Sequence, residues 1–306
     1  MGPGGFAALT GLPHVTLAHA VYLLLCTLGL SQTLLRVTED NDALAWQRPT
    51  ADRWYSQGLA IQATRWGPER AWELGLSQQL YTPWGIARAT LRPEERPFAG
   101  LLLVHGAWGR AREQWLHSLR LDLGVVGPAS LASWGQERVH RVVPQLTLEP
   151  GAWHLQLENE AVVNLRAERS GFLEGPAWRL EAGVGGSVGK LWTQADAGLA
   201  LQLGRPVGWS PPSARRWRVQ SPAEPGIALL IAADGWLVLH DITLDGNTHG
   251  QGHWVTREPL VGELRGGLVA GLGRWSASYT HVLRSREFEG QLELHQYGSA
   301  SLSVRF

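Results

Sequence analysis

A run of oxygen-bearing side chains stands near the start of the chain, in the segment EDND at residues 39–42. Carboxylate and amide oxygens are the ligands that hard cations such as Ca2+ prefer, so Asn41 and Asp42 are candidates for a cation site. Successive side chains of a strand point to opposite faces, and a β-bulge is needed to turn both toward one ligand. The alternative interpretation is a solvated strand end that binds nothing.

A second candidate site is the segment SLASWGQERVHRVV at residues 130–143, which predicts a short helix. Ser133 is a suitable N-cap, and Gln136 three residues later completes a capping box. Gln136 and His140 are four residues apart and therefore share one helix face. Histidine is the side chain best suited to accept a proton near neutral pH. Taken alone, His140 has a simpler interpretation as an exposed loop histidine.

A serine nucleophile is not indicated. Ser56, in the segment TADRWYSQG at residues 50–58, lies at the start of a predicted strand. No Gly-x-Ser-x-Gly motif surrounds it, so the sequence does not predict a serine hydrolase. Ser56 is a candidate for a supporting role only.

Composition limits the elements that position these residues. The 306 residues include 27 basic and 27 acidic side chains, and this zero net charge gives no support for a nucleic-acid partner. Charged residues are scarce, and Gly and Trp are abundant, which favours a β-protein that faces lipid. An apolar run at residues 15–30 predicts a signal peptide over residues 1–31, with a retained anchor helix as the alternative. Its Cys26 is the only cysteine, so residues 32–306 are expected to have no disulfides. No linker or break in composition divides these residues, which predicts one domain.

Strict alternation of apolar and polar residues dominates the rest of the chain, as in WELGLSQQLY at residues 72–81. Each alternating segment is a predicted strand with one apolar face. The other segments are 118–125, 153–160, 197–204, 275–283 and 290–298.

This pattern fits either a soluble β-sandwich or a transmembrane β-barrel. Strand lengths suited to crossing a membrane, and a last strand that ends in Phe306, favour the barrel. Aromatic residues at predicted strand ends indicate girdles at the membrane interfaces: Trp72, Tyr81, Trp153, Trp236, Trp275 and Tyr297. The predicted fold is all-β, a transmembrane antiparallel β-barrel of about 12 strands with a short helix in an extracellular loop. The Asp-Gly pair in LDGN at residues 244–247 predicts a tight hairpin turn, and residues 208–216 predict a longer loop.

Several segments in series resemble the lipid A 3'-O-deacylases (LpxR-type) of the Gram-negative outer membrane. They span nearly the whole mature chain: NDA (41–43), ADRWYSQG (51–58), ERPFAG (95–100), LGVVGPAS and GQERVHR within 123–141, WHLQLENE (153–160), LDGN (244–247), and the C-terminal EFEGQ and SLSVRF. The resemblance implies a twelve-stranded barrel with its active site between the barrel wall and an external-loop helix. It also implies a Ca2+-dependent esterase that removes the 3'-acyloxyacyl group of lipid A.

Carried over by residue, Asn41 and Asp42 match the family's Asn-Asp pair, and Gln136 and His140 match its Gln…His helix. Ser56 stands where the family has Thr or Ser. The resemblance implies His140 as general base, with Asn41, Ser56 and Gln136 as positioning or oxyanion groups. Asp42 is the implied Ca2+ ligand, with Ser56 beside it. Two departures affect the ligand set: Ala43 and Leu146 occupy positions that are acidic in some members.

The expected partners are lipid A within lipopolysaccharide, outer-membrane lipids and the barrel assembly machinery, with no nucleic acid. Arg92 and Arg96, near predicted outer strand ends, are candidates for contacts to lipid A phosphates. The alternatives are an inactive or differently specific barrel of this family, and a small non-catalytic outer-membrane channel.

Overall fold

The computed structural model describes residues 33–46, 53–67, 69–84, 91–142, 153–205, 225–250 and 252–306, with the backbone alone for 139–142. In this part of the chain, twelve strands and a few short helical segments are found. The strands are β1 (Thr33–Asn41), β2 (Trp54–Trp66), β3 (Arg70–Thr82), β4 (Ala99–Arg112), β5 (Trp115–Val126), β6 (Glu160–Gly175), β7 (Trp178–Gly189), β8 (Trp192–Gly204), β9 (Gly226–Asp241), β10 (Leu260–Leu272), β11 (Trp275–Arg284) and β12 (His295–Arg305). The predicted signal peptide and the predicted loop at 208–216 lie outside the described residues.

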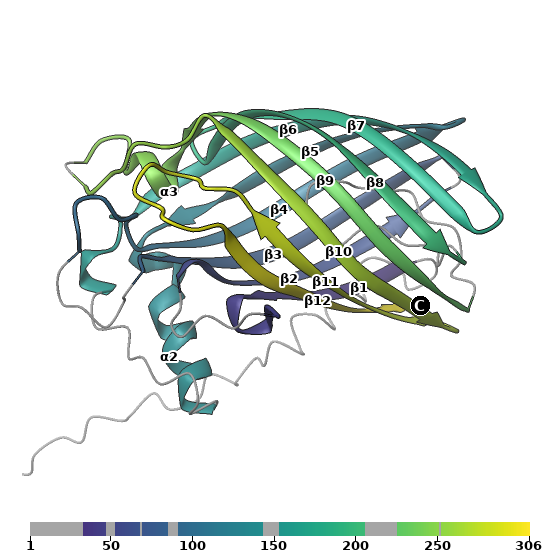
Figure 1. The fold of residues 1–306 in the computed structure, drawn as a ribbon, viewed down its shortest axis with the longest axis horizontal. Coiled ribbons are helices and arrows are strands. Elements are labelled where there is room, and N and C mark those ends of the chain that lie inside the picture. The colour runs from purple at the N-terminus through teal and green to yellow at the C-terminus, as the bar shows by residue number, and fades with distance from the viewer. Residues whose placement is uncertain are drawn as a thin grey trace, which may run out of the picture.

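The strands form one closed antiparallel barrel, because β1 pairs with β2 on one side and with β12 on the other. Closure leaves no sheet edge whose backbone groups lipid would have to satisfy. We call the end where β1 stops and β2 starts the loop end; the helices α2 (Ala132–Val142) and α3 (Ile242–Asp245) lie there (Figure 1). The opposite end, called the turn end, holds the C-terminus and tight turns such as residues 113–114 and 273–274. The prediction of about twelve strands is confirmed. Within the described ranges, no helix is both long and apolar enough to cross a membrane.

Alternation along the strands places apolar side chains outside the barrel and polar ones inside. On β5, the outward Leu119, Leu121 and Leu123 are 41–49% exposed. The inward Arg120 and Asp122 of the same strand form an ion pair at 2.7 Å. The two faces of β3 and β5 agree with the sequence pattern, as expected for a barrel whose outer surface faces lipid.

The lumen is filled by paired charges rather than open. Arg166 lies 2.8 Å from Asp196, and the His105 ring nitrogen Nε2 lies 3.1 Å from the Glu73 carboxylate. The space between these side chains has a volume of about 200 Å³. Toward the loop end, an apolar cluster fills the lumen: Tyr55, Tyr81, Ala99, Leu101, Leu103, Val126, Leu157, Val162, Leu191, Ile242, Val282 and Tyr297.

Of the two predicted aromatic girdles, the predicted residues form one only at the turn end. Trp72 and Trp275 at the turn end are 61% and 47% exposed, as a girdle requires. At the loop end, however, Tyr81 and Tyr297 point into the lumen cluster and Trp236 is buried. The prediction is wrong for the loop end, because alternation turns these residues inward or packing covers them.

Two local predictions are also wrong. Residues 153–160 are not a strand: Trp153–Leu155 is a 3-10 turn, η3, and β6 starts at Glu160. The LDGN segment does not form a hairpin turn but ends the one-turn helix α3, which the Asp241 carboxylate caps by accepting from Thr243 N at 2.8 Å. Gly246, at φ 82°, then turns the chain out of the helix.

Candidate active site on the outer wall

A polar strip interrupts the apolar outer face of β1–β3 at the loop end. The β1–β2 register pairs Glu39 with Leu59 and Asn41 with Gln57, and Leu59 is exposed on the outer face. Directly paired residues point to the same side of a sheet, so all four face outward. Gln57 Nε2 donates to the Glu39 carboxylate at 3.0 Å. Lipid cannot satisfy such groups, so the strip indicates a site rather than ordinary barrel wall.

Asn41 and Asp42 start the 3-10 turn η1 (Asp42–Leu44) directly after β1. The Asn41 carboxamide oxygen caps this turn by accepting from Ala43 N at 2.8 Å. The Asp42 side chain is buried, and its Oδ2 accepts from Arg53 N at 3.1 Å. The cap gives the Asn-Asp pair its local geometry: Asn41 is the last residue of β1, and Asp42 leaves the strand and is freed from the alternation that would turn it to the opposite face.

The η1 turn folds back over the outer face of β11 and β12. The Tyr279 hydroxyl donates to the Leu44 carbonyl at 2.7 Å, and the rings of Trp46 and His281 stack at 4.8 Å. Gly298 on β12 makes the close approach possible, because a Cβ there would lie 2.5 Å from the Leu44 carbonyl oxygen. The turn that carries Asp42 is therefore held against the wall from outside.

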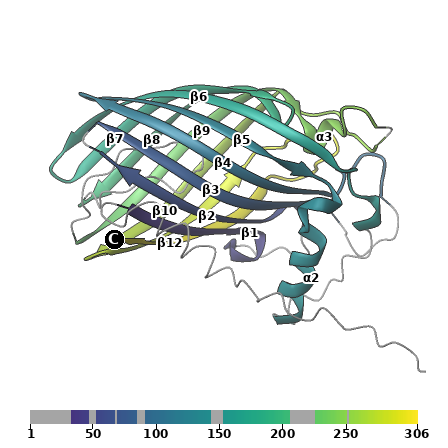
Figure 2. The same cartoon turned by 180° about the vertical axis from the view of Figure 1, so that it is seen from behind.

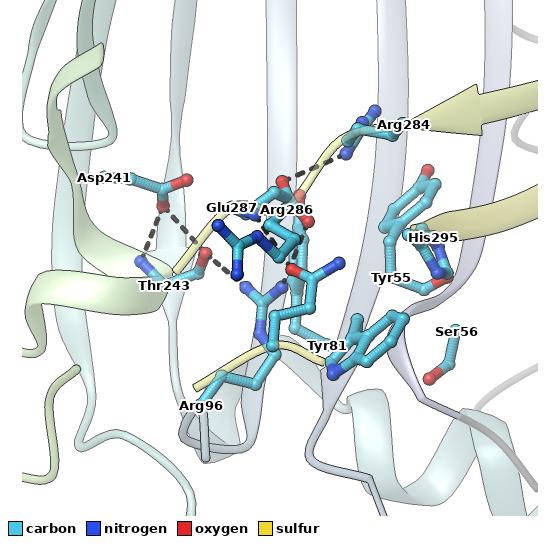
Figure 3. Close-up of polar contacts among 12 residues, drawn as sticks. Tyr55, Ser56, Tyr81, Arg96, Asp241, Thr243, Arg284, Arg286, Glu287 and His295 are labelled. Atoms are coloured by element: carbon cyan, nitrogen blue, oxygen red, sulfur yellow. Dashed lines mark hydrogen bonds and ion pairs between the residues drawn. The ribbon is translucent and has the colours of Figure 1, made fainter. Parts of the chain in front are cut away.

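Ser56 lies on β2, next to Gln57, which pairs with Asn41. The β2–β3 register shifts between Tyr55 and Gln57, so Ser56 is the extra residue of a bulge. Figure 3 shows the Tyr55 and Ser56 side chains pointing in opposite directions from β2. The Ser56 hydroxyl lies 2.5 Å from that of Thr82 at the end of β3, and both side chains are buried.

Helix α2 supplies the other side of the site and packs outside β3 and β4, as both views show (Figures 1 and 2). Gln78 on β3 donates to the Ser130 carbonyl at 2.7 Å, and Ala132 packs with Leu80 in a buried cluster. Gln136 is buried, and its Oε1 accepts from Trp153 Nε1 at 2.8 Å.

The predicted helix is confirmed, but its predicted capping box is wrong. The helix begins at Ala132, so Ser133 lies inside it rather than at the N-cap. The side chain of Ser130 takes the capping role, since its Oγ accepts from Ala132 N at 3.4 Å. The 3-10 turn η2 (Pro128–Ser130) directs the chain into the helix two residues earlier than the capping pattern predicts. His140 lies in the last turns of α2, but its side chain lies outside the described part of the chain.

Of the two candidate arginines, one is at the surface and one is not. Arg92 is partly exposed, 3.8 Å from the Glu95 carboxylate. Arg96 is fully buried at the barrel mouth, where it donates to the Thr243 hydroxyl at 2.7 Å and pairs with Glu287 (Figure 3). Burial raises the pKa of the Glu95 carboxyl, while the backbone N–H of Arg96 opposes this by donating to it. Arg96 as placed holds the mouth loops together and does not face a phosphate outside the barrel.

Comparison with known proteins assigns the chain to a family. A family model described as "Outer membrane protein LpxR" matches residues 9–306. The chain belongs to the LpxR family. It is an outer-membrane β-barrel protein of the same fold as LpxR from Salmonella typhimurium, with a TM-score of 0.76 at 20% identity over 89% of this chain and 100% of that one. Other similar structures include the beta domain of the Bordetella autotransporter BrkA (TM-score 0.46, 13% identity, 90% and 98% covered). Curated protein sequences yield no significant match.

The side chains of the described residues around η1 carry the oxygen atoms that a hard cation prefers, but few such side chains are present. The donors are oxygens, namely the Asp42 carboxylate and the Ser56 hydroxyl, as Ca2+ prefers. No group of three or more His, Cys, Asp or Glu side chains converges among the described residues. Ala43, the residue after Asp42, has no ligand atom in its side chain. Leu146 lies outside the described residues.

Three separate contacts lie at the predicted residues on the outer wall: Asp42 accepts from Arg53 N, Ser56 pairs with Thr82, and Gln136 accepts from Trp153. Sequence reasoning missed the partners in these contacts and the residues that dock η1 and α2. The signal that identifies several of them is polarity at outward strand positions, as at Glu39, Gln57 and Gln78. The residues missed are Glu39, Gln57, Gln78, Thr82, Trp153, Tyr279 and Gly298.

Proposed function

We propose that this LpxR-family barrel is a Ca2+-dependent lipid A 3'-O-deacylase that hydrolyses the ester of the 3'-acyloxyacyl group. The observation that carries the proposal is the position of the polar strip. Beside it, the buried polar residues Asp42, Ser56 and Gln136 belong to η1, β2 and α2, and η1 and α2 pack on the outer side of the wall at the loop end. Long loops mark the extracellular end of such barrels, so this site would meet lipids of the outer leaflet.

The proposed chemistry needs a general base, a stabilised oxyanion and a positioned ester. His140 accepts a proton from water, whose oxygen forms a bond to the acyl carbonyl carbon. The bond between the acyl carbon and the sugar oxygen then breaks. The sugar oxygen takes the proton from His140, so the products are a carboxylic acid and an alcohol. Asn41, Gln136 and Ser56 orient the ester and donate hydrogen bonds to it.

Asp42 and Ser56 would hold the cation. Bound Ca2+ would stabilise the negative charge that develops on the ester carbonyl oxygen. Arg92, which is partly exposed at the loop end, remains the candidate for a lipid A phosphate. Outer-membrane lipids and the barrel assembly machinery remain the expected partners of a chain of this fold.

The alternative of a passive channel is disfavoured by the lumen, which is filled with paired charges and an apolar cluster near the mouth. The alternative of a family member with another lipid substrate is an outcome of the assay that tests the proposal. Purified protein in detergent micelles is incubated with lipid A and Ca2+, and the products are read by mass spectrometry.

The proposal predicts loss of one acyloxyacyl unit from lipid A. EDTA and His140→Ala should each abolish this loss, whereas His249→Ala at an exposed loop position should not. Unchanged lipid A with cleavage of a glycerophospholipid would assign the site to another substrate. No cleavage of either lipid by folded barrel would refute the esterase.

A further inference from the structure

One carboxylate in the barrel lumen has no basic partner. Within the described ranges, the other acidic side chains that line the lumen cavity each lie within ion-pair distance of an Arg or His: Glu73, Asp122, Glu168 and Glu263. Asp40 on β1 lines the same cavity, but it forms no ion pair with any described residue. A carboxylate shielded from bulk water is costly without a counter-charge, so Asp40 indicates that something else occupies the cavity beside it.

A hydrogen bond from β2 orients the Asp40 carboxylate. The Tyr55 hydroxyl donates to Asp40 Oδ2 at 2.9 Å. Gly58 leaves room for this hydroxyl, because a Cβ at that position would lie 1.9 Å from it. The other carboxylate oxygen, Oδ1, is buried and has no hydrogen-bond partner among the described residues. One oxygen of Asp40 is therefore held by Tyr55, and the other is available to a ligand in the cavity.

Two hydroxyl groups lie beside Asp40 at the seam where the barrel closes. Ser299 on β12 pairs with Asp40 on one side and with Thr280 on the other. Directly paired residues point to the same face of a sheet, and all three residues line the lumen cavity. Thr280 is 1% exposed, and its Oγ1 has no hydrogen-bond partner in the described part of the chain. Folded proteins rarely leave a buried hydroxyl without a partner, so Thr280 points to a ligand at the same place as Asp40.

We propose that this part of the lumen binds a monovalent cation such as Na+, held by Asp40 Oδ1 and the hydroxyl oxygens of Thr280 and Ser299. Carboxylate and hydroxyl oxygens are the ligands that hard cations prefer, and a single carboxylate balances a single positive charge. The cavity volume of about 200 Å³ leaves room for water molecules that complete the coordination. The cation neutralises Asp40 and links β1, β12 and β11 across the seam. This site is inside the barrel, whereas the proposed deacylase site lies on the outer side of the wall.

The first test is the effect of Na+ on the stability of the barrel. Purified full-length protein in detergent micelles is unfolded with urea in choline chloride, and Na+ then replaces choline at constant ionic strength. The free energy of unfolding of the wild type should rise with Na+ concentration as expected for one bound ion. Equal stability in Na+ and in choline would overturn the proposal.

Three variants separate the cation from a general salt effect. Asp40→Asn keeps an oxygen for the Tyr55 hydroxyl but removes the charge, and it should abolish the response to Na+. Thr280→Val removes only a hydroxyl and should raise the Kd for Na+ roughly three- to tenfold. The matched control is Ser278→Ala, which removes a lumen hydroxyl of the same strand that already has a partner, Ser301 Oγ at 2.6 Å. It should respond to Na+ like the wild type. A Thr280→Val barrel that is more stable than wild type in Na+ would overturn the proposal, because the hydroxyl would then have no ligand.

Thallium(I) locates the ion directly, since it is monovalent and scatters X-rays anomalously. Crystals of the wild-type barrel soaked in Tl+ should show an anomalous peak between Asp40 and Thr280, and crystals of Asp40→Asn should not. The wild-type measurement holds even if a variant folds poorly. Water alone at this position would overturn the proposal and leave a hydrated cavity. None of these measurements depends on deacylation, so failure of the proposed function would not affect the result.

Discussion

The outer faces of β1–β3 and of β7–β10 belong to one barrel but differ in chemistry. On β7–β10, outward side chains such as Val184, Leu199 and Leu264 are apolar and 54–60% exposed. On β1–β3 near the loop end, outward positions carry Glu39 and Gln57 instead. This polar strip lies next to the two segments that return over the outside of the barrel, η1 and α2 (Figure 1). Polar groups on an outer wall therefore mark the place where loops replace lipid as the neighbour.

The largest effect should come from η1, the turn next to the polar strip. Asp42→Asn removes the charge of the proposed Ca2+ ligand and should lower deacylation on the order of a hundredfold or more. The barrel should keep its stability, because the substitution keeps the side-chain volume and an oxygen for Arg53 N. The measurement is the initial rate of acyl release over a range of Ca2+ concentrations. Glu289→Gln, an exposed carboxylate of the loop end, is the control and should match wild type. Equal rates for Asp42→Asn and wild type would remove Asp42 from the site.

A substitution on the apolar outer face of β7–β10 should lower the stability of the barrel and leave its activity unchanged. Leu199→Arg places a charge in the middle of β8 on a face that contacts lipid, and we expect a loss of about 2–4 kcal/mol in the free energy of unfolding. Activity per folded molecule should be unchanged. Unfolding in urea from lipid vesicles measures the stability. Leu292→Arg, at a loop position that is 73% exposed, should cost little. If both substitutions lower the free energy of unfolding equally, the β7–β10 face does not contact lipid.

A third test breaks the contact between the wall and η1. Gly298→Ala adds a Cβ 2.5 Å from the Leu44 carbonyl oxygen and 2.6 Å from Leu44 Cβ, so η1 has to move. We expect about a tenfold loss of activity, equivalent to about 1.4 kcal/mol in the barrier, with a barrel that still folds. Gly266→Ala is the matched control, because nothing lies within 4 Å of a Cβ at that position of β10. Equal activity of the two variants would show that the position of η1 does not matter for catalysis.

Strand lengths, aromatic strand ends and the last strand favoured the barrel, and the length of the chain set the number of strands at about twelve. Alternation was sufficient to predict the faces of β3 and β5, because the side-chain period of a strand is a local property. It was not sufficient to predict which outward residues are covered. Leu80 shares the outward face of Leu74 and Leu76, yet it is buried under Ala132 and Trp153. That burial depends on a contact between residues far apart in the chain, which no local pattern encodes.

The same reason explains the errors and successes at the candidate site. Segment 153–160 alternates like a strand, but Trp153 packs on Phe98 and the chain turns there. The residue types at Asn41, Asp42, Ser56 and Gln136 suggested chemistry, and the structure adds the partners that orient most of them. Glu39 and Gln57 were identifiable in principle as polar residues at outward positions. Trp153 and Gly298 were not, because their roles depend on atoms brought from other elements.

The smallest effect should come from a single hydrogen bond that ties η1 to the wall. Tyr279→Phe removes the donor to the Leu44 carbonyl, 2.7 Å away, and leaves the Trp46–His281 stack and the close approach at Gly298. A lost hydrogen bond of this kind costs about 0.5–1.5 kcal/mol. Since the other contacts still hold η1, we expect the half-saturating Ca2+ concentration to rise only about two- to fivefold. The maximal rate at saturating Ca2+ should be unchanged, because the ligands themselves are intact. A lower maximal rate with an unchanged Ca2+ requirement would mean that this contact positions the substrate and not the cation.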